Sequence, residues 1–131
     1  NVYMNQFDQY VKHELKAKHY IRYADDFVIL SHDRQLLASI ERCIAIFLSE
    51  RLKLDLHPDK VFIKTFDSGI DFLGWSHFHD HRVLRTSTKR RMLKRVAGLE
   101  ERHPSIQSYL GMLGHGNGRC LSKRILGSSV L

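Results

Sequence analysis

The sequence lacks the features that mark membrane, secreted and repetitive proteins. No apolar run approaches the roughly 20 residues that a membrane-spanning helix needs, and the first residues have neither the basic nor the apolar stretch of a signal peptide. Internal repeats and low-complexity segments are also missing. The two cysteines, Cys43 and Cys120, lie far apart with no spacing that pairs them. We therefore expect reduced thiols and a cytoplasmic protein without a membrane partner.

The sequence does contain enough apolar residues for a packed interior. Hydrophobic residues make up 43% of the 131 residues and aromatic residues 10%, so disorder is not expected. This length fits one domain, or two small lobes that share a core. The first residue is Asn1 rather than methionine, and we expect the sequence to be a piece of a longer protein.

Charge is distributed unevenly along the chain, and this is more informative than the net charge of +7. Residues 1–81 hold ten Lys and Arg against twelve Asp and Glu, whereas residues 82–131 hold eleven against two. The plain alternative is a solvated basic face that serves solubility. An acidic half followed by a strongly basic half favours metal binding in the first and polyanion binding in the second.

Apolar spacing predicts an α+β fold. Helices are expected over residues 2–17, 34–52 and 88–100, from Pro104 through Leu113, and over residues 119–126. Hairpins are expected at residues 19–31 and 70–84, with isolated strand pieces at 54–56 and 61–63. Asp33 should cap the second helix and Thr86 or Ser87 the third, while Pro104 suits the first turn of the fourth.

Two adjacent carboxylates, Asp25 and Asp26, stand between the apolar runs of the first hairpin. Like charges side by side repel, and each is costly to remove from water unless it is paired or binds a cation. On its own, such a pair is most simply interpreted as a solvated acidic turn. The alternative is a site for Mg²⁺, which takes one or two carboxylates together with substrate phosphates. No Gly or Asn supplies the usual turn signal here, and such conflicts tend to fall at functional sites.

The surrounding residues favour the cation site. Tyr23-Ala24-Asp25-Asp26 resembles the Tyr-x-Asp-Asp box of reverse transcriptases, and three further features follow it in order. These are Leu56-His57-Pro58-Asp59-Lys60, then Asp71-Phe72-Leu73-Gly74-Trp75, then the basic helix. This order resembles the second half of a bacterial-type reverse transcriptase, the group that includes group II intron and diversity-generating element enzymes. The resemblance covers the whole chain and implies an RNA-directed DNA polymerase.

The resemblance also implies a division of the chain. Residues 1–85 would form the later part of the polymerase palm, with the Asp-Asp hairpin and a hairpin resembling the primer grip. Residues 86–131 would begin a small, basic, helical thumb. The implied partners are an RNA template, a DNA primer and deoxynucleoside triphosphates. The implied reaction is template-dependent nucleotidyl transfer with two Mg²⁺ ions, or with Mn²⁺ in their place.

Roles for individual residues follow from the same resemblance. Asp25 would be the main metal ligand and Asp26 would support it, while Lys60 would protonate the leaving pyrophosphate. Tyr23 would lie near the primer terminus or the incoming nucleotide. The residues expected to grip the primer 3′ end are Phe72, Leu73, Gly74 and Trp75, and those expected to follow the duplex phosphates are Lys89, Arg90, Arg91, Lys94 and Arg95.

The sequence matches only part of the family's catalytic machinery. The family's other essential aspartate and its fingers have no match here, and Asp8, on a predicted helix, is not assigned to that role. We therefore expect the isolated chain to be catalytically inactive. A non-catalytic, maturase-like RNA-binding module is the main alternative. A further alternative is another palm polymerase, such as an RNA-dependent RNA polymerase. Those enzymes more often carry Gly in place of Ala24, which argues against this alternative.

Three alternating histidines, His77, His79 and His81, could share a strand face and bind Zn²⁺ or Cu²⁺. Polar residues at a hairpin tip are the simpler interpretation, and we favour it.

Overall fold

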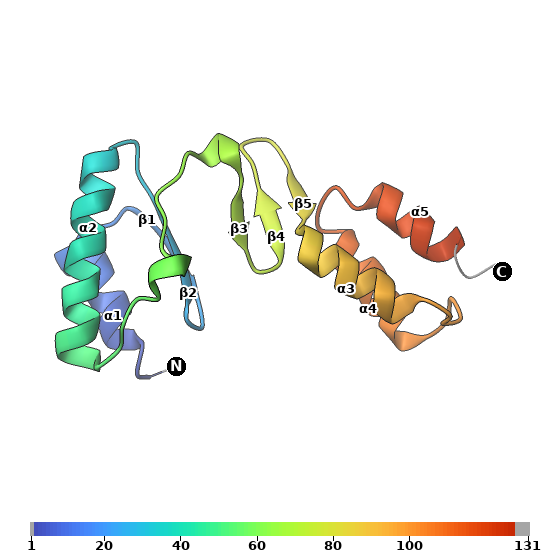
Figure 1. Cartoon of the computed structure of the whole chain (residues 1–131), viewed down its shortest axis with the longest axis horizontal. Coiled ribbons are helices and arrows are strands. Elements are labelled where there is room, and N and C mark those ends of the chain that lie inside the picture. Colours follow the sequence, from blue (N-terminus) through green and yellow to red (C-terminus); the bar gives the residue numbers. More distant parts are fainter. Residues whose placement is uncertain (1, 128–131) are drawn as a thin grey trace. The chain divides into compact units, whose positions relative to one another are not determined.

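The computed structural model describes residues 2–127, and its fold is of the α+β class (Figure 1). These residues contain helices and two small antiparallel sheets, which confirms the predicted class. The chain divides into two compact units, the first ending at Lys64 and the second beginning at Thr65. None of the helices across residues 2–127 has both the length and the apolarity that crossing a membrane requires.

The first unit combines one β-hairpin with two helices. Its elements are α1 (Asn5–Gln9) continued by a π-helical turn (Tyr10–Glu14), β1 (His19–Tyr23), β2 (Asp26–Leu30), α2 (Arg34–Phe47) continued by a second π-helical turn (Leu48–Leu52), and a 3₁₀ turn (Pro58–Lys60). β1 and β2 pair antiparallel, as predicted. Both predicted helices are present, although the first is shorter than the expected residues 2–17.

One face of this hairpin packs against the helices. Tyr20 and Ile29 form one cross-strand pair and Arg22 and Phe27 form the next, so these four side chains share a face. Tyr20, Phe27 and Ile29 pack on a core whose buried members are Phe7, Val11, Ile40, Ile44, Leu48 and Leu52. The ring of Phe7 contacts the rings of Tyr20 and Phe27 edge-on. The hairpin is thereby fixed on α1 and α2.

Asp33 caps α2, as predicted. Its Oδ1 accepts hydrogen bonds from the backbone N–H groups of Gln35 at 2.8 Å and Leu36 at 3.2 Å. The cap satisfies two of the four donors that a helix start leaves without a partner. Ile40 and Ile44, one turn apart, are buried in the core, so the cap and the apolar stripe together define this helix.

Residues 53–64 contain no strand, so the predicted strand pieces at 54–56 and 61–63 are wrong. The chain leaves the helix through Lys53 in the left-handed conformation, with φ of 53°, and then makes only the 3₁₀ turn. Leu54 and Phe62 are exposed. An apolar run becomes a stable strand only when a neighbour pairs with it, and among the described residues the sheet of the first unit consists of β1 and β2.

The second unit consists of a three-stranded sheet followed by three helices. Its elements are a 3₁₀ turn (Phe66–Ser68), β3 (Ile70–Phe72), β4 (Trp75–His77), β5 (Arg82–Leu84), α3 (Thr86–Val96), α4 (Pro104–Leu113) and α5 (Arg119–Gly127). The strands pair antiparallel in the order β3-β4-β5, which confirms the predicted hairpin and its return strand. The three predicted helices are present, and α3 ends at Val96 rather than at residue 100. Residues 128–131 of the predicted thumb lie outside the described residues.

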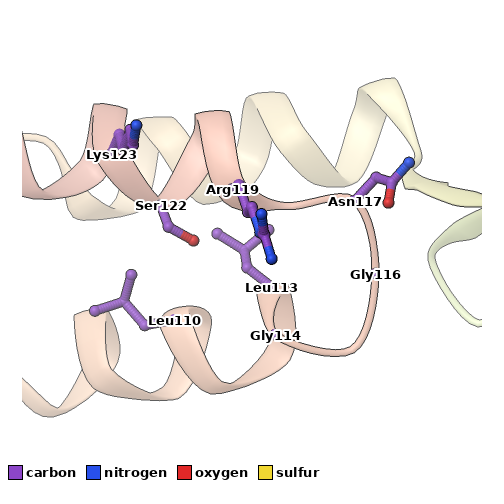
Figure 2. A pocket seen from close by; sticks show the side chains of 8 residues that line it. All are labelled: Leu110, Leu113, Gly114, Gly116, Asn117, Arg119, Ser122 and Lys123. Carbon is purple, nitrogen blue, oxygen red and sulfur yellow. The ribbon is translucent and has the colours of Figure 1, made fainter.

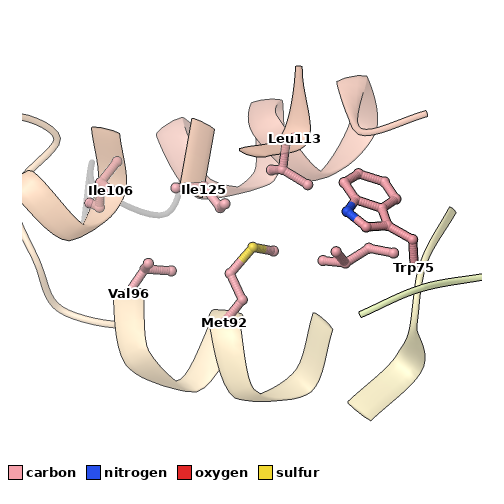
Figure 3. Packing of buried hydrophobic residues seen from close by; sticks show 7 residues of the cluster. Trp75, Met92, Val96, Ile106, Leu113 and Ile125 are labelled. Atoms are coloured by element: carbon pink, nitrogen blue, oxygen red, sulfur yellow. The ribbon is translucent and has the colours of Figure 1, made fainter. Parts of the chain in front are cut away.

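A single core joins the sheet and the helices of the second unit. Trp75 of β4 and Leu84 of β5 are buried with residues of all three helices, namely Met92, Val96, Ile106, Leu113 and Ile125 (Figure 3). The compact units therefore divide between residues 64 and 65, whereas the predicted boundary between residues 85 and 86 falls inside this core. Strands of three residues bury too little apolar surface by themselves and need the helices to pack against.

The start of α3 differs from the prediction, whereas the start of α4 agrees with it. Thr86 and Ser87 lie inside the first turn of α3, so the predicted side-chain cap there is wrong. The carbonyl of Arg85 instead accepts from the Lys89 N–H at 2.8 Å. Pro104 occupies the first turn of α4 as predicted, and the preceding His103 caps this helix through Nδ1.

Candidate functional site

The predicted catalytic carboxylates lie at the tip of the first hairpin. Tyr23 pairs with Asp26 across the strands, which leaves Ala24 and Asp25 as a two-residue turn. We call residues 23–26 the carboxylate turn. Asp25 and Asp26 are exposed, and neither side chain forms an ion pair or a hydrogen bond within residues 2–127. Their oxygens are therefore open to a ligand from solvent.

The carboxylate turn offers part of the ligand set of a hard cation. Mg²⁺ prefers oxygen ligands and is usually held by one or two carboxylates together with waters and substrate phosphates. Across the described residues, no cluster of three or more His, Cys, Asp or Glu side chains could hold a metal ion. Asp25 and Asp26 fit the role of the carboxylate pair, and the remaining ligands would have to come from water and phosphate.

An uncovered apolar face runs from the carboxylate turn along the hairpin. Ile21 faces Val28 across the strands and Tyr23 faces Asp26, so these side chains lie on the side opposite the core. Ile21 is 57% exposed and Tyr23 is 65% exposed. The register therefore places an exposed tyrosine ring directly beside Asp26.

The backbone of the carboxylate turn is strained at Ala24, whose φ is 53°. A residue with a Cβ atom is less stable in the left-handed region by roughly 1–2 kcal/mol. Two-residue hairpin turns normally place Gly or Asn at such a position. The missing turn signal in the sequence thus corresponds to a real strain next to Asp25, and strain of this kind concentrates at functional sites.

A partly buried network of charged and polar groups supports the turn from the core side. The Arg22 guanidinium donates from Nε to Asp8 Oδ1 at 2.8 Å and from Nη2 to Asp8 Oδ2 at 2.5 Å. Its Nη1 donates to the Ala24 carbonyl at 2.7 Å. The Tyr20 hydroxyl donates to Asp8 Oδ1 at 2.6 Å. Arg22 therefore ties the carboxylate turn to α1, which carries Asp8.

The network keeps its acid and base charged. The hydrogen bond from Arg22 lowers the pKa of Asp8 to about 2, against the opposing effect of burial. The same bond raises the pKa of Arg22 above its already high usual value. Burial, together with the bond to Asp8, raises the pKa of Tyr20. Asp8 and Arg22 are thus an ion pair at neutral pH and well below it.

The sequence prediction assigns no role to Arg22 or to Asp8. A signal was nevertheless present, because strand alternation places Arg22 on the same face as Tyr20, which packs on the core. An arginine on a buried face requires an acidic partner. The partner itself could not be chosen from the sequence, because α1 brings Asp8 to the sheet only through packing.

Lys60, the predicted proton donor, ends the 3₁₀ turn of the first unit and is exposed. The Lys60 N–H donates to the His57 carbonyl at 3.0 Å, and the His57 Nδ1 accepts from the Asp59 N–H at 3.3 Å. No hydrogen bond or ion pair links the Lys60 ammonium to Asp25 or Asp26. The structure does not join Lys60 to the carboxylate turn, and its catalytic role stays a prediction.

The second predicted contact region is the tip of the β3–β4 hairpin. Phe72 pairs with Trp75, which leaves Leu73 and Gly74 as a two-residue turn with φ of 52° and 83°. Positive φ at both positions is typical of a type I′ turn, for which Asn-Gly is a favoured sequence. Leucine is strained at the first position, and its side chain is 49% exposed. Packing within the second unit does not explain why a leucine occupies this strained, exposed position.

The other predicted residues of this hairpin are less accessible. Trp75 is buried, and Gly116 lies so close to it that an added Cβ atom would stand 2.3 Å from the indole ring. Phe72 is half-buried. Of the four predicted primer-contacting residues, Leu73 is therefore the one with an exposed large side chain, while Trp75 holds the hairpin against the helices.

A basic surface covers the solvent side of α3. Its cationic residues are Lys89, which is half-buried, and Arg90, Arg91, Lys94 and Arg95, which are exposed. Within the described residues none of the five forms an ion pair. Arg90 and Lys94 are neighbours on the helix, as are Arg91 and Arg95, and such like-charge pairs destabilise a helix by roughly 0.2–0.5 kcal/mol each. This surface is open to a polyanion, which would relieve that repulsion.

A pocket of about 650 Å³ lies between the end of α4 and the start of α5 (Figure 2). Leu110 and Leu113 line it from α4, and Arg119, Ser122 and Lys123 line it from α5. None of the predicted site residues belongs to it. Arg119 and Lys123 are two further cations of the second unit, and they line this pocket rather than α3.

The alternating histidines do not share a strand face. His77 ends β4, whereas His79 and His81 lie in the loop before β5. The His81 ring stacks on Phe78, and its Nδ1 lies 2.6 Å from Asp80 Oδ1. This arrangement favours polar residues at a hairpin tip.

Comparison with known proteins assigns no family to the chain, since no protein-family model matches it and no curated protein gives a significant match.

Proposed function

We propose that this chain is part of an RNA-directed DNA polymerase, in which it supplies the later palm and the start of the thumb. The carboxylate turn carries the proposal. It presents two exposed carboxylates without partners in the described residues, on a strained turn that a bridging arginine supports. A merely solvated acidic turn requires neither the strain nor the arginine, so these features support a cation site.

The proposed chemistry gives each predicted site residue of the first unit a role. Asp25 and Asp26 would hold Mg²⁺ or Mn²⁺, and a cation there stabilises the charge that develops on phosphate oxygens during nucleotidyl transfer. Tyr23, exposed beside Asp26, offers a ring to the sugar or base of a nucleotide. Lys60 would add positive charge, or a proton, at the leaving pyrophosphate.

The second unit would bind the template–primer duplex. The cations of α3 lack acidic partners among the described residues, and a row of phosphates would neutralise them with release of counterions. Leu73 would contact the primer strand, and Trp75 would keep that hairpin rigid. Phosphate and sugar contacts carry no sequence information, which suits an enzyme that copies any template.

We also propose that the chain alone is catalytically inactive. A two-metal site needs carboxylates that hold both cations, and the described residues offer one adjacent pair at the carboxylate turn. Primer extension with Mg²⁺ and this polypeptide alone is expected to give no incorporation. Detectable incorporation would overturn this part of the proposal.

A non-catalytic RNA-binding module is the second candidate. The basic surface of α3 favours it, because that surface would bind structured RNA whether or not a cation occupies the carboxylate turn. The two candidates differ in one testable respect. A polymerase holds the primer 3′ end beside Asp25 and Asp26, and a plain RNA-binding module does not.

Cleavage by bound iron tests this difference. The chain is bound to an RNA template–DNA primer duplex, Fe²⁺ replaces Mg²⁺, and the positions cut by locally generated radicals are mapped. The polymerase proposal predicts cuts concentrated at the primer 3′ end, which disappear in the Asp25→Asn/Asp26→Asn variant while duplex affinity is kept. Diffuse cutting that is the same in both proteins would favour the RNA-binding module.

Salt dependence tests the role of α3. The Arg91→Gln/Arg95→Gln variant should bind the duplex more weakly, and the slope of log affinity against log salt should fall by about 2. The matched control is Arg42→Gln/Arg51→Gln, which removes two exposed arginines from α2 and the turn that follows it. An equal effect of both variants would mean that only net charge matters.

A further inference from the structure

We propose that Arg22 is the positioning residue of the carboxylate turn: it holds the peptide between Ala24 and Asp25 in the left-handed turn that presents both carboxylates to a divalent cation. The inference rests on the proposed function in one respect, namely that the turn binds a cation. The positioning itself is a property of the folded first unit and can be measured without metal.

The acceptor of the Arg22 hydrogen bond explains how it acts. The Ala24 carbonyl belongs to the peptide group that leads into Asp25, and Nη1 donates to this oxygen at 2.7 Å. A bond to the oxygen fixes the plane of the peptide, and that plane sets the direction in which Asp25 leaves the turn. Arg22 forms the cross-strand pair next to the one that closes the turn. It therefore reaches the carbonyl from the adjacent position on the inner face.

Arg22 can fix the turn because its own position is fixed. Nε and Nη2 bind both oxygens of Asp8, in the bidentate geometry that makes Arg–carboxylate pairs directional. The side chains of Arg22 and Asp8 are 12% and 22% exposed, so water reaches the pair only in part. The planar guanidinium leaves its third nitrogen for the turn, and a lysine could not make all three contacts.

The plain alternative is that the Asp8–Arg22 pair only ties α1 to the sheet. In that case losing Arg22 would lower stability without changing the conformation of the turn or its affinity for a cation. The strain argues against this alternative. Ala24 has φ of 53°, which is uncommon for a residue other than Gly, and the Arg22 bond acts directly on the carbonyl of this residue.

The first test needs no metal. A residue at positive φ shows a strong nuclear Overhauser effect between its own amide and Hα protons, and Ala24 of the full 131-residue chain should show it. In Arg22→Met this signal should weaken while contacts between Phe7 and Phe27 persist. If Arg22→Met fails to fold, Arg22→Lys takes its place, because lysine keeps the charge near Asp8. An unchanged Ala24 signal in the folded variant would overturn the inference.

The second test measures the cation. Mn²⁺ titrated into the chain should broaden the amide signals of Asp25 and Asp26 first, and Arg22→Met should weaken this binding about tenfold, as loss of supporting contacts does at metal sites. The control is Ile40→Val, which loosens the same core away from the turn. Equal weakening in Ile40→Val would show a plain stability effect and overturn the inference, as would full affinity in Arg22→Met.

The outcomes separate the two proposals. If the wild-type chain shows no Mn²⁺ broadening at the turn, the cation site of the proposed function fails, and the Ala24 signal still decides the role of Arg22. If wild type and Arg22→Met bind Mn²⁺ equally, the proposed function survives and the positioning role does not.

Discussion

The ion pair between Asp8 and Arg22 should make the stability of the first unit depend on pH in a defined window. Replacing Asp8 with Asn removes the charge while keeping the shape of the side chain. The pKa of Asp8 is lowered from 3.8 to about 2, and a shift of this size corresponds to about 2 kcal/mol of stability. Because the pair is partly open to water, we expect Asp8→Asn to lower the free energy of unfolding by about 1–2 kcal/mol at neutral pH.

The direction of the pH dependence follows from the direction of the pKa shift. Asp8 binds its proton less tightly in the folded chain than in the unfolded chain, so its contribution is present above about pH 4 and is lost as the pH falls toward 2. The Asp8→Asn variant lacks this contribution at every pH. The difference between the two proteins in free energy of unfolding should therefore shrink as the pH is lowered through this window.

Urea unfolding at several pH values measures this difference. The single tryptophan, Trp75, lies in the second unit, so the amide NMR signals of Phe27 and Ile29 must report on the first. The matched control is Asp55→Asn, because Asp55 is exposed and forms no ion pair in the described residues. A loss below about 0.5 kcal/mol at neutral pH, the size of an ordinary surface substitution, would refute the reasoning. So would a difference that does not shrink toward pH 2.

Three further predictions concern other contacts. Asp33→Ala should lower the stability of the first unit by about 1 kcal/mol through loss of the α2 cap, and a stability unchanged in urea would contradict the cap. Gly116→Ala should lower the stability of the second unit by about 1–3 kcal/mol, because the new Cβ atom would stand 2.3 Å from the Trp75 ring. The same substitution should alter tryptophan emission, and an unchanged emission spectrum would argue against this contact. Leu73→Asn should raise the stability of the second unit by about 1 kcal/mol, because Asn-Gly suits the turn, and should weaken duplex binding. A loss of stability in Leu73→Asn would contradict the strain.

Elements that depend on local interactions could be predicted from the sequence. Asp33 followed by an amphipathic run specifies α2, because the cap and the helical stripe act within a few residues. The first hairpin was predictable because two apolar runs stand on either side of the adjacent carboxylates Asp25 and Asp26. The irregular conformation of residues 53–64 was not predictable. Their apolar residues suggest strands, but in the described part of the chain no strand pairs with them.

The candidate site likewise has features that could be predicted from the sequence and features that could not. The Asp25-Asp26 pair, the Leu73-Gly74 tip and the cations of α3 could be named from their order in the sequence. The burial of Trp75 could not, because the helices that cover it come later in the chain.

By itself, the sequence determined the α+β class, the two hairpins, the carboxylate pair and the basic helix, because these follow from periodicity, charge and short spacing. Only the tertiary structure decided that Arg22 bridges Asp8 and the Ala24 carbonyl, that Ala24 and Leu73 are strained, and that β3–β5 share a core with the helices. The Arg22 bridge and the shared core depend on packing between elements that are apart in sequence, whereas the strain at Ala24 and Leu73 lies in two-residue turns whose positive φ only the folded backbone shows. Local patterns show which residues need a partner, and packing decides which partner they receive.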